Sequence, residues 1–165
     1  MKDNKTEMNL THREIHLDLD CCIPANLRIP KELKCINIGT YDHNPYIKSV
    51  HFYGSKKIGN WAFYKSKNLS SVTFENCIEF EIGSFAFAHT NLTDFIFPQK
   101  TLFDPNTVGV FNGCSNMEYI FIPESWKDVD RIDLELFIGN CPAKVQIAQK
   151  LRCHCRNKRM RMLLE

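Results

Sequence analysis

The sequence predicts an α/β-type repeat solenoid, mostly strand and coil, in which short parallel strands stack on one another. Two observations predict this fold: a phrase that recurs at a fixed interval through the middle of the chain, and a short alternating apolar pattern that follows each copy. A unit of this size cannot bury its apolar face alone, and the stacking of neighbouring units buries it. No helical pattern is long enough to serve as the crossover of an ordinary parallel sheet.

The recurring phrase is Ile-Gly-x-x-Ala-Phe. Residues 58–63, Ile-Gly-Asn-Trp-Ala-Phe, return 24 positions later as residues 82–87, Ile-Gly-Ser-Phe-Ala-Phe. A third, weaker copy ends at Val110-Phe111, again 24 positions after Ala86-Phe87. Self-similarity at a period of this size is typical of repeat architectures.

The second pattern is apolar-x-x-apolar-x-apolar, and its alternating end predicts a short strand with one buried face. Its copies are Leu33-x-x-Ile36-x-Ile38, Ile47-x-x-Val50-x-Phe52, Leu69-x-x-Val72-x-Phe74, Leu92-x-x-Phe95-x-Phe97, Met117-x-x-Ile120-x-Ile122 and a degraded Val145-x-Ile147. Measured at the middle apolar residue, the steps are 14, 22, 23, 25 and 25 positions. We therefore expect strands centred on Ile36, Val50, Val72, Phe95 and Ile120, with a weaker sixth at Val145.

These residues resemble the BspA-like class of leucine-rich repeats. Residues 111–123, Phe-Asn-Gly-Cys-Ser-Asn-Met-Glu-Tyr-Ile-Phe-Ile-Pro, follow the pattern of that class nearly position for position, and the resemblance extends over residues 33–147. The chain departs from the class at residues 104–108, which replace the usual Ile-Gly, and in the long segment 125–130. The resemblance implies a leucine-rich-repeat fold and a protein-binding role, because members of this class are often surface antigens or adhesins.

We expect three parts: residues 1–30 as an N-terminal cap, residues 31–148 as a leucine-rich-repeat solenoid of about five to six coils, and residues 149–165 as a basic tail or capping helix. From Lys150 to Glu165 six bases face one acid, a balance of +5, so the net charge of +2 leaves −3 for the rest of the chain. The tail fits a helical cap, a solvated segment or a ligand for an acidic surface. The rest of the chain lacks the net positive charge typical of nucleic-acid-binding proteins, and no nucleic-acid partner is expected.

The sequence gives two opposing indications about the compartment. No apolar run approaches the length of a membrane-spanning helix, so no membrane span is expected. The first seven residues are polar and no apolar segment follows them, which is typical of a chain without a signal peptide. The lack of a signal or anchor in this chain favours an intracellular location, whereas the family resemblance favours the cell surface.

The eight cysteines fit free thiols in a reducing compartment, because no Cys-x2-Cys pair occurs. In the resembled class a small residue stands three positions after each repeat Phe. Here Ser66, Thr90 and Cys114 occupy that position, with Cys141 one position late. We therefore expect Cys114 and Cys141 to be core thiols, buried and unreactive.

The candidate binding residues stand between the buried strand positions and should face outward from the sheet. They are His51, Tyr53, Thr73, Asp94, Ile96, Tyr119 and Phe121. The row changes from polar in the N-terminal coils to apolar in the C-terminal ones, where Ile96, Tyr119 and Phe121 would form one exposed patch. We expect a partner protein, or a second copy of the chain, to bind there. The alternative is that the tail after Ala148 folds back and covers the patch.

These features favour a non-catalytic protein-recognition module, by resemblance a surface antigen or adhesin-like protein, with no catalytic residues. No hydrolase, P-loop, zinc-protease or dinucleotide-binding motif occurs. The His12/His16 pair lies in a strand-like alternation and Cys153-x-Cys155 has no nearby second half, so no metal and no cofactor are expected. Two alternatives stay open: a small metal- or thiol-dependent enzyme, and an intracellular scaffold that uses the basic tail.

Overall fold

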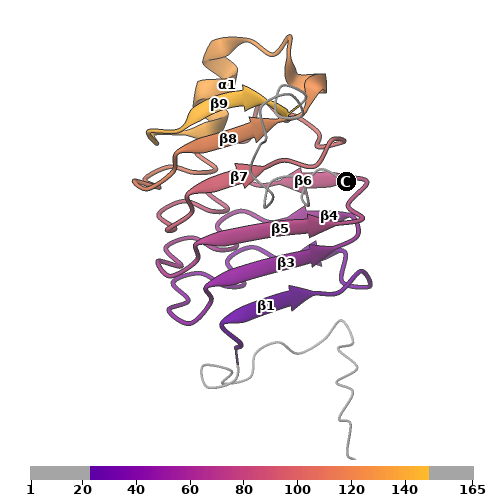
Figure 1. Ribbon diagram of the computed structural model, residues 1–165, viewed down its shortest axis with the longest axis vertical. Coiled ribbons are helices and arrows are strands. Elements are labelled where there is room, and N and C mark those ends of the chain that lie inside the picture. Colours follow the sequence, from indigo (N-terminus) through magenta and orange to yellow (C-terminus); the bar gives the residue numbers. More distant parts are fainter. Residues whose placement is uncertain (1–22, 149–165) are drawn as a thin grey trace, which may run out of the picture.

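The computed structural model describes residues 23–148, which form a solenoid of about five turns. In this part of the chain six strands stack in parallel along the long axis: β1 (Asn26–Ile29), β3 (Ser49–Tyr53), β5 (Ser71–Glu75), β7 (Asp94–Ile96), β8 (Tyr119–Ile122) and β9 (Lys144–Ile147) (Figure 1). A second column of parallel pairs joins β2 (Cys35–Ile36), β4 (Lys56–Ile58) and β6 (Phe80–Ile82). The stacked parallel strands confirm the predicted fold class.

The strand register follows the repeat in the sequence. Five of the predicted centres lie in stacked strands: Val50, Val72, Phe95, Ile120 and Val145. The hydrogen-bonded ladder is interrupted between β5 and β7, so the six strands form two sheets of three. The two strands remain neighbours (Figure 1), and the ring centroids of Phe74 and Phe95 lie 5.7 Å apart. Aromatic packing therefore continues the stack where backbone pairing stops.

The prediction for Ile36 is wrong: its strand belongs to the second column and not to the stack that contains Val50. The strand that precedes β3 in the stack is β1, in which Leu27 lies opposite Val50, 23 positions away. Ile36 pairs instead with Ile58 of β4, and Ile38 is 67% exposed. The irregular step of 14 arose because Ile36 occupies the slot of the Ile-Gly phrase and not the slot of the stacked strand. With Leu27 as the first centre the repeat is regular.

A third column of hydrogen bonds runs along the turns that follow β2, β4 and β6. Amide N–H groups of Tyr41, Phe63 and Phe87 donate to carbonyls of the next coil at 2.7, 2.8 and 3.0 Å. These three turns and the corresponding turn of the next coil each begin with a left-handed φ of 55 to 65°, at Gly39, Trp61, Phe85 and Gly109. Glycine adopts this conformation without strain, whereas an aromatic residue does not. The Trp61 and Phe85 rings stack with centroids 6.4 Å apart, which offsets part of that cost.

Phenylalanine rings fill the space between the columns. Phe63 stacks on Phe87 with centroids 5.2 Å apart and planes 6° from parallel, and Phe87 stacks on Phe111 at 6.2 Å. These rings come from the same position of successive coils. The predicted core residues are all at most 1% exposed: Ala62, Phe63, Leu69, Ala86, Phe87, Leu92, Phe111 and Met117. Burial of this apolar surface is the main stabilising contribution to the stack.

The last coil contains a helix that the repeat pattern did not predict. A short 3-10 turn, η1 (Glu124–Trp126), leads into α1 (Arg131–Ile138). The Asp130 carboxylate caps α1 by accepting the Ile132 N–H at 2.7 Å. Its last turn buries Phe137 and Ile138, while Trp126 Nε1 donates to the Thr101 carbonyl at 2.9 Å. The segment that departs from the repeat therefore still supplies core side chains.

Leu92→Ala should lower the free energy of unfolding by about 2–5 kcal/mol, because Leu92 is fully buried and alanine leaves a cavity. The matched control is Leu102→Ala, since Leu102 is 62% exposed. Its cost should be within about 0.5 kcal/mol of zero. Chemical denaturation of both variants measures the difference, and similar costs would contradict the assignment of the core.

Gly83→Ala should destabilise the protein by about 1–3 kcal/mol, the usual range for overpacking, and towards its upper end because the contact is with backbone. A Cβ at Gly83 would lie 2.6 Å from the backbone nitrogen of Asn60 in the preceding coil. Gly39→Ala is the comparison, because it has a positive φ but no atom nearer than 4.0 Å to its Cβ. Its cost should be about 1 kcal/mol, from the backbone conformation alone. A larger cost at Gly39 than at Gly83 would show that the coils do not approach so closely.

Candidate functional site

The candidate site is the front face, defined here as the outward side of the six stacked strands. Inward residues such as Val50, Phe52 and Phe95 are at most 1% exposed, and the residues between them point outward. The outward residues are Asn26, Arg28, Ser49, His51, Tyr53, Ser71, Thr73, Glu75, Asp94, Ile96, Tyr119, Phe121, Lys144 and Gln146. Rows on neighbouring strands lie about 5 Å apart. All seven predicted binding residues therefore lie at outward positions on the same side of the stacked strands.

The N-terminal half of the front face is a polar cross-strand network. His51 Nδ1 and Thr73 Oγ1 are hydrogen-bonded at 2.6 Å, and His51 Nε2 lies 3.4 Å from Glu75 Oε2. The Tyr53 ring lies against the imidazole with centroids 4.3 Å apart. Cross-strand pairs of this kind stabilise a sheet and fix the direction of each side chain. The network holds a half-buried imidazole and a phenol in defined positions at the surface.

The C-terminal half is more apolar but less exposed than predicted. Ile96 and Tyr119 are half-buried and Asp94 is exposed. Phe121, expected to be exposed, is only 2% exposed, so that part of the prediction is wrong. The Tyr119 ring lies nearly parallel to the Phe121 ring, with centroids 6.0 Å apart, and Phe121 is flanked in register by Ile96. Tyr119 therefore presents the accessible aromatic surface and Phe121 supports it.

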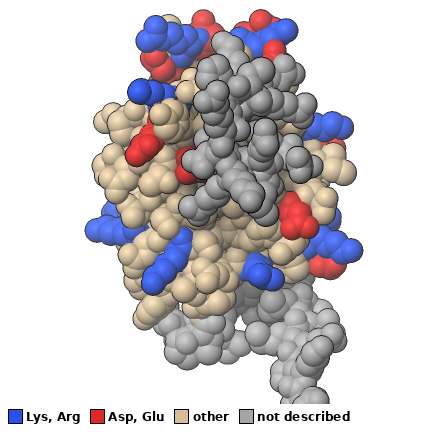
Figure 2. Space-filling view, in the orientation of Figure 1, with Lys and Arg blue, Asp and Glu red and all other residues tan. Residues whose placement is uncertain are grey.

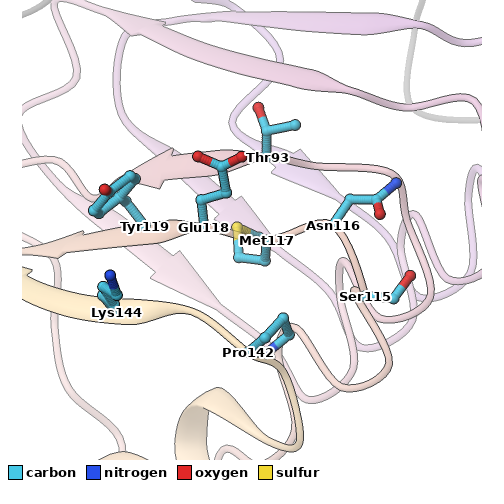
Figure 3. A pocket seen from close by; sticks show the side chains of 8 residues that line it. All are labelled: Thr93, Ser115, Asn116, Met117, Glu118, Tyr119, Pro142 and Lys144. Atoms are coloured by element: carbon cyan, nitrogen blue, oxygen red, sulfur yellow. The ribbon is translucent and has the colours of Figure 1, made fainter.

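A shallow hollow of about 570 Å³ adjoins Tyr119 at the amino ends of β7, β8 and β9. Figure 3 shows its lining residues: Thr93, Ser115, Asn116, Met117, Glu118, Tyr119, Pro142 and Lys144. Glu118 directly precedes β8 and Lys144 is the first residue of β9, so the hollow offers groups of both charges. Of these residues the sequence analysis named Tyr119 as a binding residue and Met117 as core; the hollow itself was not predicted, because its other lining residues lie outside the apolar pattern.

The described cysteines differ in burial. Cys114 is fully buried, its Sγ donates to the Phe87 carbonyl at 3.1 Å, and burial raises the pKa of its thiol. This confirms Cys114 as a core thiol. Cys141 is half-buried, so the expectation of a buried core thiol is wrong there. It follows α1 in the last described coil and lines an open hollow of about 750 Å³, and no further described coil covers it.

A buried lysine on the second column of strands escaped the sequence analysis. Lys56 is 3% exposed, and its Nζ donates to the Pro30 carbonyl at 2.8 Å. Burial lowers the pKa of the Lys56 ammonium, and the nearby Lys34 lowers it further. Lys56 stands two residues before Ile58, so strand alternation places both side chains inward. The sequence could have identified Lys56 as buried from this alternation.

Two features are absent from residues 23–148. The described chain has no group of three or more His, Cys, Asp or Glu side chains placed to hold a metal ion. Over the same residues no helix has the length and apolar character needed to cross a membrane. The His12/His16 pair, Cys153-x-Cys155 and the basic tail lie outside the described residues.

Alkylation should distinguish the thiols by burial. In iodoacetamide at pH 8, exposed Cys35 should react at least tenfold faster than Cys114, because burial both shields Cys114 and raises its pKa. A raised pKa leaves less thiolate at any pH below it, so the difference should persist across neutral pH. Mass spectrometry of timed digests measures both rates, and unfolding in urea should abolish the difference. Equal rates in the folded protein would contradict the packing of Cys114.

Comparison with known proteins places the chain in a repeat family. No curated protein matches it. A similar solved structure, a leucine rich cell surface protein from Faecalibacterium prausnitzii A2-165, is 20% identical with a TM-score of 0.49. The match covers 78% of this chain but only 34% of that one. The model of the BspA type leucine rich repeat region matches residues 19–143 in 6 copies. Because that match spans most of the sequence, the chain belongs to the BspA type leucine rich repeat family.

Proposed function

We propose that the chain is a non-catalytic protein-recognition module and that the front face is its binding surface. One observation carries the proposal: a continuous row of partly exposed aromatic and polar side chains on adjacent parallel strands. Solenoids of stacked repeats present such extended surfaces to macromolecules. Membership of the BspA type repeat family supports the same class of function.

The proposed roles follow from exposure and contacts. Tyr53 and Tyr119 supply aromatic contact area, because tyrosine combines a large apolar ring with a polar end. His51, Thr73 and Asp94 supply polar contacts around them. Ile96 extends the apolar area beside Tyr119. Phe121 acts indirectly, by holding the Tyr119 ring.

The finer part of the proposal is a surface antigen or adhesin-like role, with an extracellular protein as partner. It rests on the family, whose BspA-like members include such proteins, and on the mixed aromatic and polar character of the front face. Burial of tyrosine in a protein interface is often worth 2 kcal/mol or more, about a 30-fold change in Kd. A single front-face substitution should therefore have a measurable effect.

Tyr119→Ala should weaken binding of the full chain to immobilised extracellular-matrix protein by at least about tenfold, as measured by surface plasmon resonance. The matched control is Tyr46→Ala, because Tyr46 is 49% exposed but lies in the turn between β2 and β3, off the front face. The control should bind as the unsubstituted chain does. Equal losses in both variants, or no binding by any of them, would overturn the proposed surface or the proposed partner class.

A further inference from the structure

A second candidate surface lies off the front face, on the turns that follow β2, β4 and β6. Figure 2 shows the molecule from the front-face side, where the visible Lys and Arg side chains lie chiefly towards the margins. On the turns, successive coils instead carry aromatic rings at one position. That position holds, in order along the stack, Gly39, Trp61, Phe85 and Gly109. Two rings therefore lie between two glycines.

The two rings form a stack that is closed at its C-terminal end. The Trp61 and Phe85 ring planes are 6° from parallel, and their centroids lie 6.4 Å apart. Beyond them the Phe85 ring lies over Gly109, because a Cβ at Gly109 would come within 2.6 Å of the Phe85 Cε1 atom. The glycine therefore leaves room for the Phe85 ring, and the ring fills that room.

The stack is open at its other end, over Gly39. The Gly39 N–H donates to the Asn60 carbonyl at 3.0 Å, which holds Gly39 beside the turn that carries Trp61. Among the described residues, a Cβ at Gly39 would meet only the Asp42 Cβ, at 4.0 Å. Within residues 23–148 the Trp61 ring pairs with the Phe85 ring alone, and Trp61 is 43% exposed. One face of the indole is thus accessible beside an unfilled space, and we name the two together the Trp61 slot.

The backbone of Trp61 also indicates a role for its side chain. Its φ of 55° is strained for an aromatic residue, whereas glycine adopts this conformation freely, as Gly39 and Gly109 do. Strained residues persist only where the surrounding structure holds them, and they cluster at ligand-binding positions. Stacking on Phe85 holds the indole in place, but it does not explain why so large a ring keeps its other face in water.

The groups beside the slot combine apolar surface with hydrogen-bonding capacity. Ile38 directly precedes Gly39 and is 67% exposed, and the exposed Asp42 carboxylate is paired with the His43 imidazole at 2.5 Å. This combination suits a pyranose ring, whose C–H face packs on an indole while its hydroxyls bond to carboxylate and imidazole. A nucleotide is a poorer match, because Asp42 would repel its phosphates. A proline-rich peptide would leave the same carboxylate without a donor.

We propose that the Trp61 slot binds a neutral saccharide, with one pyranose ring on the free face of the indole. Gly39 leaves room for that ring, and Phe85 supports the indole from behind. Asp42 and His43 form hydrogen bonds with the hydroxyls. The slot lies off the front face, so its tests are independent of the proposed protein recognition.

Tryptophan fluorescence of the full chain tests the site directly. The chain has two tryptophans, and Trp126 is only 2% exposed, so acrylamide should quench mainly Trp61. Cellohexaose and maltohexaose are neutral glucose hexamers that present their pyranose faces differently. At least one of them should lower the quenching constant at least twofold and saturably, whereas hexaproline and adenosine monophosphate should not. No protection by either sugar, or equal protection by hexaproline or the nucleotide, would overturn the proposal.

Substitutions then locate the binding, measured by isothermal titration calorimetry with the protecting hexasaccharide. Trp61→Gly should weaken binding at least tenfold, and glycine keeps the left-handed turn without strain. Gly39→Asn should weaken it at least fivefold, because asparagine tolerates this φ and its side chain fills the slot. The matched control is Leu102→Ala, which removes an apolar side chain that is 62% exposed away from these turns and should bind as the unsubstituted chain does. Circular dichroism checks that the variants fold, and unchanged affinity in Trp61→Gly would contradict the assignment.

Discussion

Backbone hydrogen bonding between successive coils is the constraint on which the rest of this molecule depends. No coil is large enough to enclose its own apolar residues, so each Phe of the repeat is buried only when the next coil is in register. The N–H groups of Tyr41, Phe63 and Phe87 set that register along the turns, and the strand ladders set it along the sheets. Where the ladder stops, between β5 and β7, aromatic contact maintains the stacking. This register also sets the order of the outward residues along the front face.

The repeat in the sequence was sufficient to predict the fold class, most strand centres and the core, because register and burial are both periodic in it. Ile36 was misplaced because two slots of one coil share the same apolar alternation, and only pairing distinguishes them. Helix α1 and its Asp130 cap interrupt the period, so the pattern carried no signal for them. For the candidate site, the sequence predicted which strand residues face outward. The burial of Phe121 was not, because alternation gives the direction of a side chain and not how closely its neighbours pack against it.

The front face combines two kinds of surface with different physical roles. The His51 network satisfies polar groups across strands and stiffens the N-terminal half. The C-terminal half has the half-buried ring of Tyr119 beside exposed Asp94 and a shallow hollow lined by Glu118 and Lys144. One half therefore fixes its side chains by hydrogen bonds, and the other offers apolar and charged groups to a partner.

The central claim is that coil-to-coil hydrogen bonds form one cooperative stack that positions the front face. Amide hydrogen exchange of the full chain, followed residue by residue by NMR, tests it most directly. The account predicts that the N–H groups of Phe63, Phe87 and Phe97, which bond to three successive coils, exchange at one slow, common rate set by global unfolding. Fast exchange at Phe63 or Phe87 while Phe97 stays protected would contradict it, because the coils would then open independently.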